Sequence, residues 1–303
     1  MFSIAVENIS KTYGKVRALQ DVSFSVAPGE LFGLIGPDGA GKSTLFRILT
    51  TLILADSGSA SVAGNAVVKA YKNIRKTIGY MPGTFSLYQD LTVQENLDFF
   101  AAIFGTSIQE NYALIKDIYV QLEPFKDRFA GKLSGGMKQK LALCCALIHK
   151  PTVLFLDEPT TGVDAVSRVE FWEMLKKLKQ KGITILVSTP YMDEASLCDR
   201  IALIQSGKIL SINTPQKLIT DFKAPLLALK HKDPYQLLQY VRTLPITDSI
   251  LPFGAYLHWV LNDTISVDEI QRTYFHKQYS STEIAVIEPS VEDVFLALSK
   301  DSN

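Results

Sequence analysis

The segment that decides the fold of this 303-residue chain is Gly36-Pro37-Asp38-Gly39-Ala40-Gly41-Lys42-Ser43-Thr44. It fits the phosphate-binding pattern G-x-x-x-x-G-K-[ST] at every fixed position. The apolar residues 31–35 before it are typical of a buried strand, and residues 44–49 after it are typical of the first turns of a helix. In such a strand–loop–helix unit, glycines let backbone N–H groups surround an anion, and the helix N-terminus adds about half a positive charge. A Gly-rich turn that matches by chance is the alternative, and the flanking strand and helix argue against it.

The pattern therefore predicts a nucleotide site. Lys42 is expected to contact the β- and γ-phosphates, and the Ser43 hydroxyl is expected to ligate Mg²⁺. The other residues of the loop are expected to hold the phosphates through their backbone.

Composition limits the classes of function. The chain has 31 Lys and Arg against 31 Asp and Glu, so no bulk positive charge favours nucleic acid as a partner. Its longest apolar run, residues 141–148, is much shorter than the roughly 20 residues that span a bilayer. The first residues do not resemble a signal peptide. The three cysteines, Cys144, Cys145 and Cys198, lack metal-ligand spacing, and we expect reduced thiols in a cytoplasmic protein.

An aromatic residue precedes the phosphate loop. Residues 4–9 and 22–26 alternate apolar and polar positions, as half-buried antiparallel strands do, and residues 10–14 between them are expected to form a turn. Tyr13 in that turn could be a packing residue. Ahead of a phosphate loop it is also a candidate stacking platform for adenine, worth on the order of 1–3 kcal/mol.

A pair of carboxylates follows a second apolar run. Residues 153–156 are continuously apolar, as in a parallel strand covered on both faces, and Asp157 and Glu158 come directly after them. A carboxylate at the C-terminal end of such a strand faces the ligand crevice. We expect Asp157 to hold Mg²⁺ through water and Glu158 to orient or deprotonate the attacking water. A capped strand end before the turn at Pro159 is the alternative.

A second anion-binding helix end is predicted at Leu133-Ser134-Gly135-Gly136-Met137-Lys138-Gln139. Apolar residues from Met137 onward fall on one helical face, so a buried helix should begin near Ser134. Ser134 can cap that helix, and two glycines leave its first amides bare. The alternative is an ordinary capped helix, which has no need of two glycines.

Together these segments resemble the ATP-binding-cassette (ABC) ATPase family. Tyr13, the 36–44 loop, the 133–139 segment, residues 153–158 and the turn Thr161-Gly162-Val163-Asp164 stand in that family's order and spacing, over roughly residues 2–220. The resemblance implies two subunits that sandwich two ATP molecules head to tail, with the 133–139 segment of one chain covering the ATP of the other and Asp164 in the dimer turn. Residues 131–141 and 188–195 are most similar to bacterial drug-export cassettes, which bind a separate membrane-spanning permease.

Two positions depart from the family pattern. After residues 78–82 the family usually has a Gln that senses Mg²⁺ and the attacking water, and here the residue is Gly83. After residues 185–189 it usually has a His that contacts the γ-phosphate, and here the residue is Pro190, which has neither a side-chain donor nor an N–H. Gln89 and Gln94 follow Gly83, and the sequence does not place either at the site. We therefore expect intact binding, impaired hydrolysis and a preference for a heterodimer with a second cassette, with a homodimer as the alternative.

The expected fold is α/β, a P-loop NTPase core with an antiparallel β subdomain and a helical subdomain, followed by a small ferredoxin-like α+β domain. Its boundaries are predicted as 1–222 for the ATP-binding domain, about 84–150 for the helical subdomain and 223–303 for the last domain. Thr92 and Glu95 form a predicted capping box, and residues 84–90 before it are expected to be an exposed apolar surface for a permease. In the last domain the order of predicted elements is βαββαβ, followed by a helix that opens with Ser290 and Asp293.

The predicted function is that of the motor subunit of a membrane exporter, held on the inner face of the membrane by its permease. The alternative is an ATP-dependent clamp or switch that works without a permease. Ribosome-binding clamps usually carry two cassettes and a charged linker, and chromosome-associated ones carry a long coiled coil. Neither feature is found in this sequence.

Overall fold

The computed structural model describes residues 2–275 and 279–300 and divides the chain into two compact units, Met1–Pro215 and Gln216–Asn303. The break falls at Pro215, whereas the sequence analysis placed it after Phe222. The difference is the helix α7 (Pro215–Asp221), most of which belongs to the second unit.

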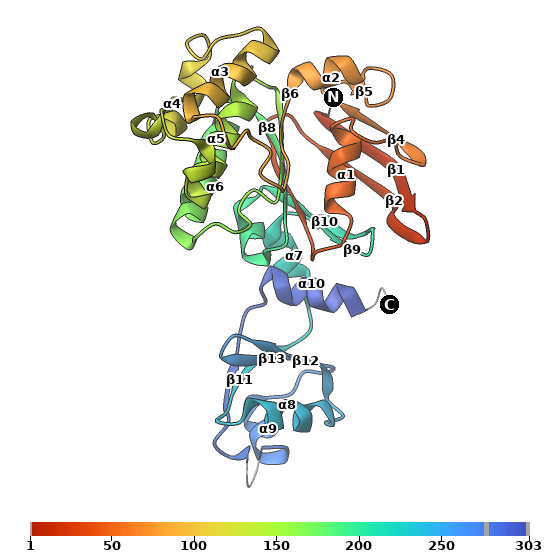
Figure 1. Ribbon diagram of the computed structural model, residues 1–303. Coiled ribbons are helices and arrows are strands. Elements are labelled where there is room, and N and C mark those ends of the chain that lie inside the picture. Colours follow the sequence, from red (N-terminus) through yellow and green to blue (C-terminus); the bar gives the residue numbers. More distant parts are fainter. Residues whose placement is uncertain (1, 276–278, 301–303) are drawn as a thin grey trace. The chain divides into compact units, whose positions relative to one another are not determined.

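A six-stranded sheet forms the centre of the first unit (Figure 1). Neighbouring strands from β9 to β6 are parallel, and only the edge strand β10 runs antiparallel to its neighbour. In sheet order the strands are β10 (Lys208–Asn213), β9 (Arg200–Gln205), β3 (Leu31–Ile35), β8 (Thr184–Thr189), β7 (Val153–Asp157) and β6 (Ile78–Met81). Every residue of β3, β7 and β8 is buried, as expected for parallel strands covered on both faces. The predicted strands at 31–35 and 153–156 are confirmed.

A second sheet is antiparallel throughout. Its order is β2 (Val16–Val26), β1 (Ile4–Tyr13), β4 (Ser57–Val62) and β5 (Asn65–Ala66). The predicted antiparallel pair is confirmed, but the turn predicted at residues 10–14 is wrong, because β1 continues to Tyr13. The chain reverses at Gly14, whose φ of 57° suits a residue without a side chain.

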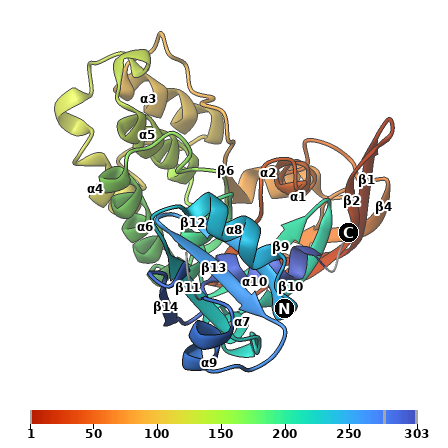
Figure 2. The ribbon, with the colours of Figure 1, turned by 90° about the horizontal axis from the view of Figure 1, so that it is seen from below.

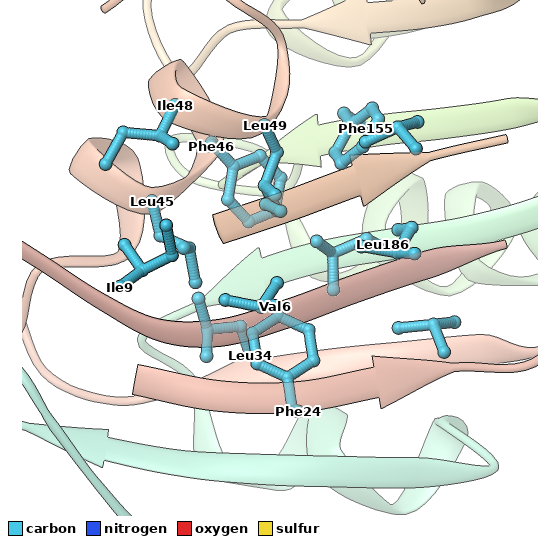
Figure 3. Close-up of a cluster of buried hydrophobic side chains, with 14 of the residues drawn as sticks. Val6, Ile9, Phe24, Leu34, Leu45, Phe46, Ile48, Leu49, Phe155 and Leu186 are labelled. Carbon is cyan, nitrogen blue, oxygen red and sulfur yellow. The ribbon is translucent and has the colours of Figure 1, made fainter. Parts of the chain in front are cut away.

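The helix that follows the phosphate loop joins the two sheets. Apolar side chains of α1 (Lys42–Leu49) lie between residues of the antiparallel sheet and residues of the central sheet in one continuous core (Figure 3). The Phe46 ring meets that of Phe155 on β7 edge to face, with centroids 6.0 Å apart. Burial of a side chain of this size contributes about 1.5–3 kcal/mol to the stability of the fold. This packing therefore fixes α1, and with it the phosphate loop, against the central sheet.

Most of the helices of the first unit come from the middle of its sequence. They are α2 (Tyr71–Thr77), α3 (Val93–Phe104), α4 (Tyr112–Tyr119), η1 (Glu123–Phe125), η2 (Ala130–Lys132), α5 (Gly135–Leu147) and α6 (Ala165–Gln180). Helices α3 to α6 lie together to one side of the central sheet (Figure 1). The predicted capping box is confirmed, with the Thr92 side chain accepting from Glu95 N and the Glu95 side chain accepting from Thr92 N. Helix α5 begins directly after Ser134, whose side chain caps it, as predicted. Within the described residues, no helix is both long and apolar enough to cross a membrane.

The second unit has the βαββαβ order that the sequence predicts. Its elements after α7 are β11 (Leu226–Lys230), α8 (Pro234–Arg242), β12 (Thr247–Phe253), β13 (Tyr256–Leu261), α9 (Val267–Thr273), β14 (Glu283–Val286) and α10 (Val291–Lys300). The antiparallel sheet has the order β12-β13-β11-β14, so the first and third strands are central, as in ferredoxin-like domains. Helix α8 packs against β12 and β13 (Figure 2). The predicted capping box is present, because the Asp293 carboxylate accepts from Ser290 N and the Ser290 hydroxyl accepts from Asp293 N.

Candidate nucleotide-binding site

The site lies at one edge of the central sheet, where four parallel strands end. Strand β3 leads into the 36–44 loop, β7 ends at Asp157, β8 ends one residue before Pro190, and β6 ends two residues before Gly83. Because the carboxyl ends of parallel strands meet at the same edge, residues far apart in the sequence converge there.

The phosphate loop depends on its glycines for close backbone approach. A Cβ at Gly36 would lie 2.1 Å from the Ile204 carbonyl oxygen, and one at Gly41 would lie 2.3 Å from the Ala18 carbonyl oxygen. Gly41 also has a φ of 104°, which favours glycine, and it stands at the N-cap of α1 without a side-chain cap. The first amides of α1 are therefore left for another acceptor, as at an anion-binding helix end.

Lys42 and Glu158, two of the expected site residues, are brought together. The Lys42 side chain is only 3% exposed, and its ammonium lies 3.1 Å from Glu158 Oε1. The same ammonium donates to the carbonyl oxygens of Gly36 at 2.8 Å and Pro37 at 3.0 Å. A buried ammonium is tolerated only with such partners, so the loop, the helix and the end of β7 hold one cation among them.

Asp157 and Glu158 are fixed by Ser188 on the neighbouring strand β8. The Ser188 hydroxyl donates to Asp157 Oδ1 at 2.6 Å and accepts from Glu158 N at 3.0 Å. Glu158 has a φ of 51°, a conformation that a residue with a side chain adopts only when its surroundings hold it. Ser188 was not among the predicted site residues, although a hydroxyl residue at the end of a buried strand was a usable signal.

The two departures from the family pattern lie at this edge. A Cβ at Gly83 would be 3.2 Å from the Asp157 carbonyl oxygen, so position 83 lies directly against Asp157.

Nearby on β6, burial raises the pKa of Tyr80 to about 12, helped by the negative charge of Asp157, so this phenol stays protonated at neutral pH.

The two glutamines that follow Gly83 are engaged elsewhere. The Gln94 amide group donates to Asp98, and its oxygen accepts from the Tyr119 hydroxyl at 3.0 Å. The Gln89 side chain lies beside Gly131. Neither glutamine therefore takes the place of the missing one in this conformation.

A pocket of about 600 Å³ opens over the phosphate loop. It is lined by Lys15 before β2, by residues of β2 and the loop, and by Glu158 and Ser206; the full lining is Lys15, Val16, Arg17, Ala18, Gln20, Gly39, Gly41, Lys42, Ser43, Thr44, Glu158 and Ser206. Tyr13 is not among these residues. It is 45% exposed at the end of β1 and pairs with Val16 across the strand reversal. The cations Lys15 and Arg17 were not among the predicted site residues. Two basic residues so soon after Tyr13 could have indicated a place for phosphate or another anion.

The chemistry of this pocket fits a nucleoside triphosphate with Mg²⁺. Uncapped helix amides and the Lys42 ammonium suit phosphate oxygens. The Ser43 hydroxyl in the pocket and the buried Asp157 carboxylate at the end of β7 are oxygen ligands of the kind that Mg²⁺ prefers.

The 133–139 segment presents only part of itself to solvent. Ser134 and Gly135 are exposed, whereas Leu133 and Gly136 are buried. Ser134 Oγ accepts from Met137 N at 3.4 Å. Gly136 has a packing reason within the chain, since a Cβ there would lie 2.5 Å from Ser167 Oγ.

The last residues of that segment face the 84–90 loop. Lys138 Nζ lies 5.4 Å from the centre of the Phe85 ring, and Gln139 lines a separate groove beside that loop. Among the seven residues of the segment, Ser134 and Gly135 are therefore the exposed ones.

Asp164 has a role of its own in the chain. It is the N-cap of α6, and its side chain accepts from Ser167 N at 3.0 Å. That hydrogen bond holds the pKa of Asp164 below its usual value. A contact with a second subunit through this turn remains a proposal.

Comparison with known proteins identifies the family. The model of the family described as ABC transporter matches residues 19–161. The Nod factor export ATP-binding protein I of Rhizobium etli is 35% identical over 305 residues, which cover 99% of this chain and 94% of that protein. The chain belongs to the ABC transporter family.

Other proteins that are similar to this ABC cassette also belong to ABC transporters. The probable multidrug ABC transporter ATP-binding protein YbhF of Escherichia coli is 38% identical over 93% of the chain, which spans about half (49%) of YbhF. Among solved structures, cbiO1 from Clostridium perfringens, part of the ABC transporter complex cbiONQ, has a TM-score of 0.65 at 25% identity over 73% of this chain and 91% of that one. The cassette MJ0796, in a dimeric post-hydrolysis state bound to ADP and Pi, has a TM-score of 0.63 at 26% identity over 70% of this chain and 98% of that one.

For this cassette we predict that Lys42→Ala weakens ATP binding about 10- to 100-fold, because a hydrogen-bonded charge facing the phosphates is worth about 1.5–3 kcal/mol. Equilibrium titration with a fluorescent ATP analogue measures it. Lys176→Ala, which removes an exposed lysine paired with Glu173, is the control and should bind as the unmodified chain does. Unchanged affinity in Lys42→Ala would contradict the assignment of the loop.

A second prediction concerns Tyr13. If its ring stacks on adenine, Tyr13→Ala should weaken ATP binding about 5- to 100-fold, while Tyr13→Phe binds nearly as the unmodified chain does, because stacking needs the ring and not the hydroxyl. The same titration reads both variants. Equal losses in the two would indicate a hydrogen bond instead, and no loss in either would mean that the ring stays outside the site.

Proposed function

We propose that this chain is the ATP-binding and ATP-hydrolysing subunit of a membrane exporter, in which closure of two cassettes on ATP moves a separate permease. The observation that carries the proposal is the buried Lys42 beside Glu158 at the mouth of the phosphate loop. The names of the relatives, a multidrug transporter protein and Nod factor export proteins, support export over an ATP-dependent clamp without a permease. In this role the chain works in the cytoplasm, on the inner face of the membrane.

The proposed roles follow from the contacts. Lys42 turns from Glu158 to the β- and γ-phosphates when ATP enters, and the amides at the start of α1 hold the same oxygens. Ser43 and Asp157 hold Mg²⁺, which neutralises charge on the phosphate oxygens when bound. Glu158, released from Lys42, accepts the proton of the attacking water or orients it.

The proposed contact with the permease uses the groove beside the 84–90 loop. The groove has a volume of about 300 Å³, and its lining includes the apolar side chains of Phe85, Leu87, Phe100 and Phe104. Leu87 is itself buried in the groove, while Tyr88 beside it is exposed and packs edge to face on Phe99. An apolar hollow with an aromatic rim suits an apolar helix of a permease.

The chain's own ATP is proposed to turn over slowly. Gly83 lies against Asp157 with no side chain, and Pro190 follows β8 with neither a side-chain donor nor an N–H. Loss of one preorganised donor to developing charge typically lowers the rate about 10²–10³-fold. Ser134 and Gly135, which serve the opposite site in a sandwich, are exposed and complete. We therefore favour a heterodimer in which a second cassette supplies its own Gln and His, with a homodimer as the alternative.

We predict that the double variant Gly83→Gln with Pro190→His hydrolyses ATP about 10- to 100-fold faster than the unmodified chain, because it restores two donors at the phosphates. Hydrolysis by the isolated chain at saturating MgATP measures it. The 3.2 Å between a Cβ at position 83 and the Asp157 oxygen leaves room for the glutamine after a small shift.

The matched control is Gly83→Ala with Pro190→Ala, which replaces the glycine and the proline at both positions but adds no side-chain donor. It should leave the rate within about twofold of the unmodified chain, since no group that stabilises the transition state is gained. Vigorous, cooperative hydrolysis by the unmodified chain alone would contradict the proposal that its own site is slow.

A further inference from the structure

A buried carboxylate lies next to the proposed site and has no part in the roles described above. Glu194, in the short helix η3 (Met192–Leu197), is only 1% exposed. Its Oε1 accepts from the Thr160 hydroxyl at 2.8 Å and lies 3.2 Å from Arg168 Nε, and its Oε2 accepts from the Thr189 hydroxyl. A carboxylate at this depth is tolerated only because all of these donors surround it.

The three partners come from three segments that lead to the site. Thr189 is the last residue of β8 and stands directly before Pro190. Thr160 lies two residues after Glu158, at the start of the turn that runs to Asp164. Arg168 belongs to α6, which begins directly after Asp164. Glu194 therefore joins the 189–191 loop to the 158–164 turn.

The same loop is held from its other end by Arg168. The guanidinium carbon lies 4.6 Å from the centre of the Tyr191 ring, and Tyr191 N donates to Thr189 Oγ1 at 3.1 Å. The Thr189 hydroxyl thus faces Glu194, and the Tyr191 ring faces Arg168. Directly before Thr189, Ser188 contacts Asp157 and Glu158.

We infer that Glu194 is a positioning residue for ATP hydrolysis: it locks the 189–191 loop to the 158–164 turn, so that this loop acts on Asp157 and Glu158 through Ser188. In this chain the loop has no donor at position 190, and its remaining contribution to the reaction is the placement of those carboxylates. This inference rests on the proposed function, because it assumes that the Lys42 site hydrolyses ATP.

The test compares two neighbouring acids that share one arginine. Glu194→Gln keeps the side chain's size, but its amide nitrogen cannot accept a hydrogen bond and the anion facing Arg168 is lost. We expect its single-turnover rate of ATP hydrolysis to fall about 10-fold while ATP affinity stays within about twofold, the pattern of a group that acts only in the transition state. Asp193→Asn is the matched control, because Asp193 also pairs with Arg168 but is 71% exposed, and its rate should stay within about twofold.

Thr160→Val adds a milder change, because it removes one hydroxyl donor and leaves Glu194 its other partners. Its rate should fall about three- to fivefold at unchanged affinity, and the combination with Glu194→Gln should fall no further than Glu194→Gln alone, since both act through one network.

Three results would overturn the inference: a Glu194→Gln rate equal to that of Asp193→Asn, a parallel loss of rate and affinity, or independent effects of Thr160→Val and Glu194→Gln. The unmodified chain separates this failure from that of the proposed function. If it neither binds nor hydrolyses ATP, the proposed function is wrong; if it does both and depends on Lys42, only the role of Glu194 is wrong.

Discussion

The site depends on one constraint, the burial of the Lys42 ammonium at the junction of a loop, a helix and the end of a strand. An ammonium that is 3% exposed needs acceptors close by, and the carbonyl oxygens of Gly36 and Pro37 and the Glu158 carboxylate supply them. These acceptors are in place only because β3 and β7 end at the same edge of the sheet and because the core around Phe46 holds α1 above that edge. The fold thus brings one cation and one carboxylate into contact across more than a hundred residues of sequence.

The arrangement separates binding from catalysis. The groups proposed to hold the nucleotide in its ground state, namely the helix amides, Lys42, Ser43 and Asp157, are all present at this edge. The groups that act on the transferring phosphoryl in the family are missing at Gly83 and Pro190, and the nearby Gln94 is hydrogen-bonded to Asp98 and Tyr119 instead. We propose that a cassette built in this way holds ATP and serves its partner through Ser134 and Gly135, while its own turnover depends on how well Asp157 and Glu158 are placed.

Local signals in the sequence predicted much of the fold. The phosphate loop, the buried strand before Asp157, the capping boxes at Thr92 and Ser290 and the helix after Ser134 each depend on a few neighbouring residues, and the structure has them all. The turn predicted at residues 10–14 was wrong because cross-strand pairing with β2 extends β1 to Tyr13, a tertiary effect that local alternation does not reveal. The structure divides the chain at Pro215 and not after Phe222, because residues 216–221 of α7 belong to the second unit.

Ser188 and Glu194 escaped prediction because their contacts join segments that are far apart in the sequence. These contacts form where β8 lies beside β7 and where Glu194 of η3 meets Thr160. Tyr13 illustrates the opposite case. Its position before the loop suggested an adenine platform, whereas in this conformation the pocket is lined by the nearby Lys15, Val16 and Arg17 and not by Tyr13.

The fate of ATP bound to the isolated chain tests the central claim most directly. The chain is loaded with radiolabelled MgATP, freed of unbound nucleotide, and sampled over time for the ratio of ATP to ADP in the bound fraction. The account predicts that the bound nucleotide remains mostly ATP for many minutes and that Lys42→Ala retains almost none. Rapid conversion of the bound ATP to ADP by the unmodified chain would contradict it.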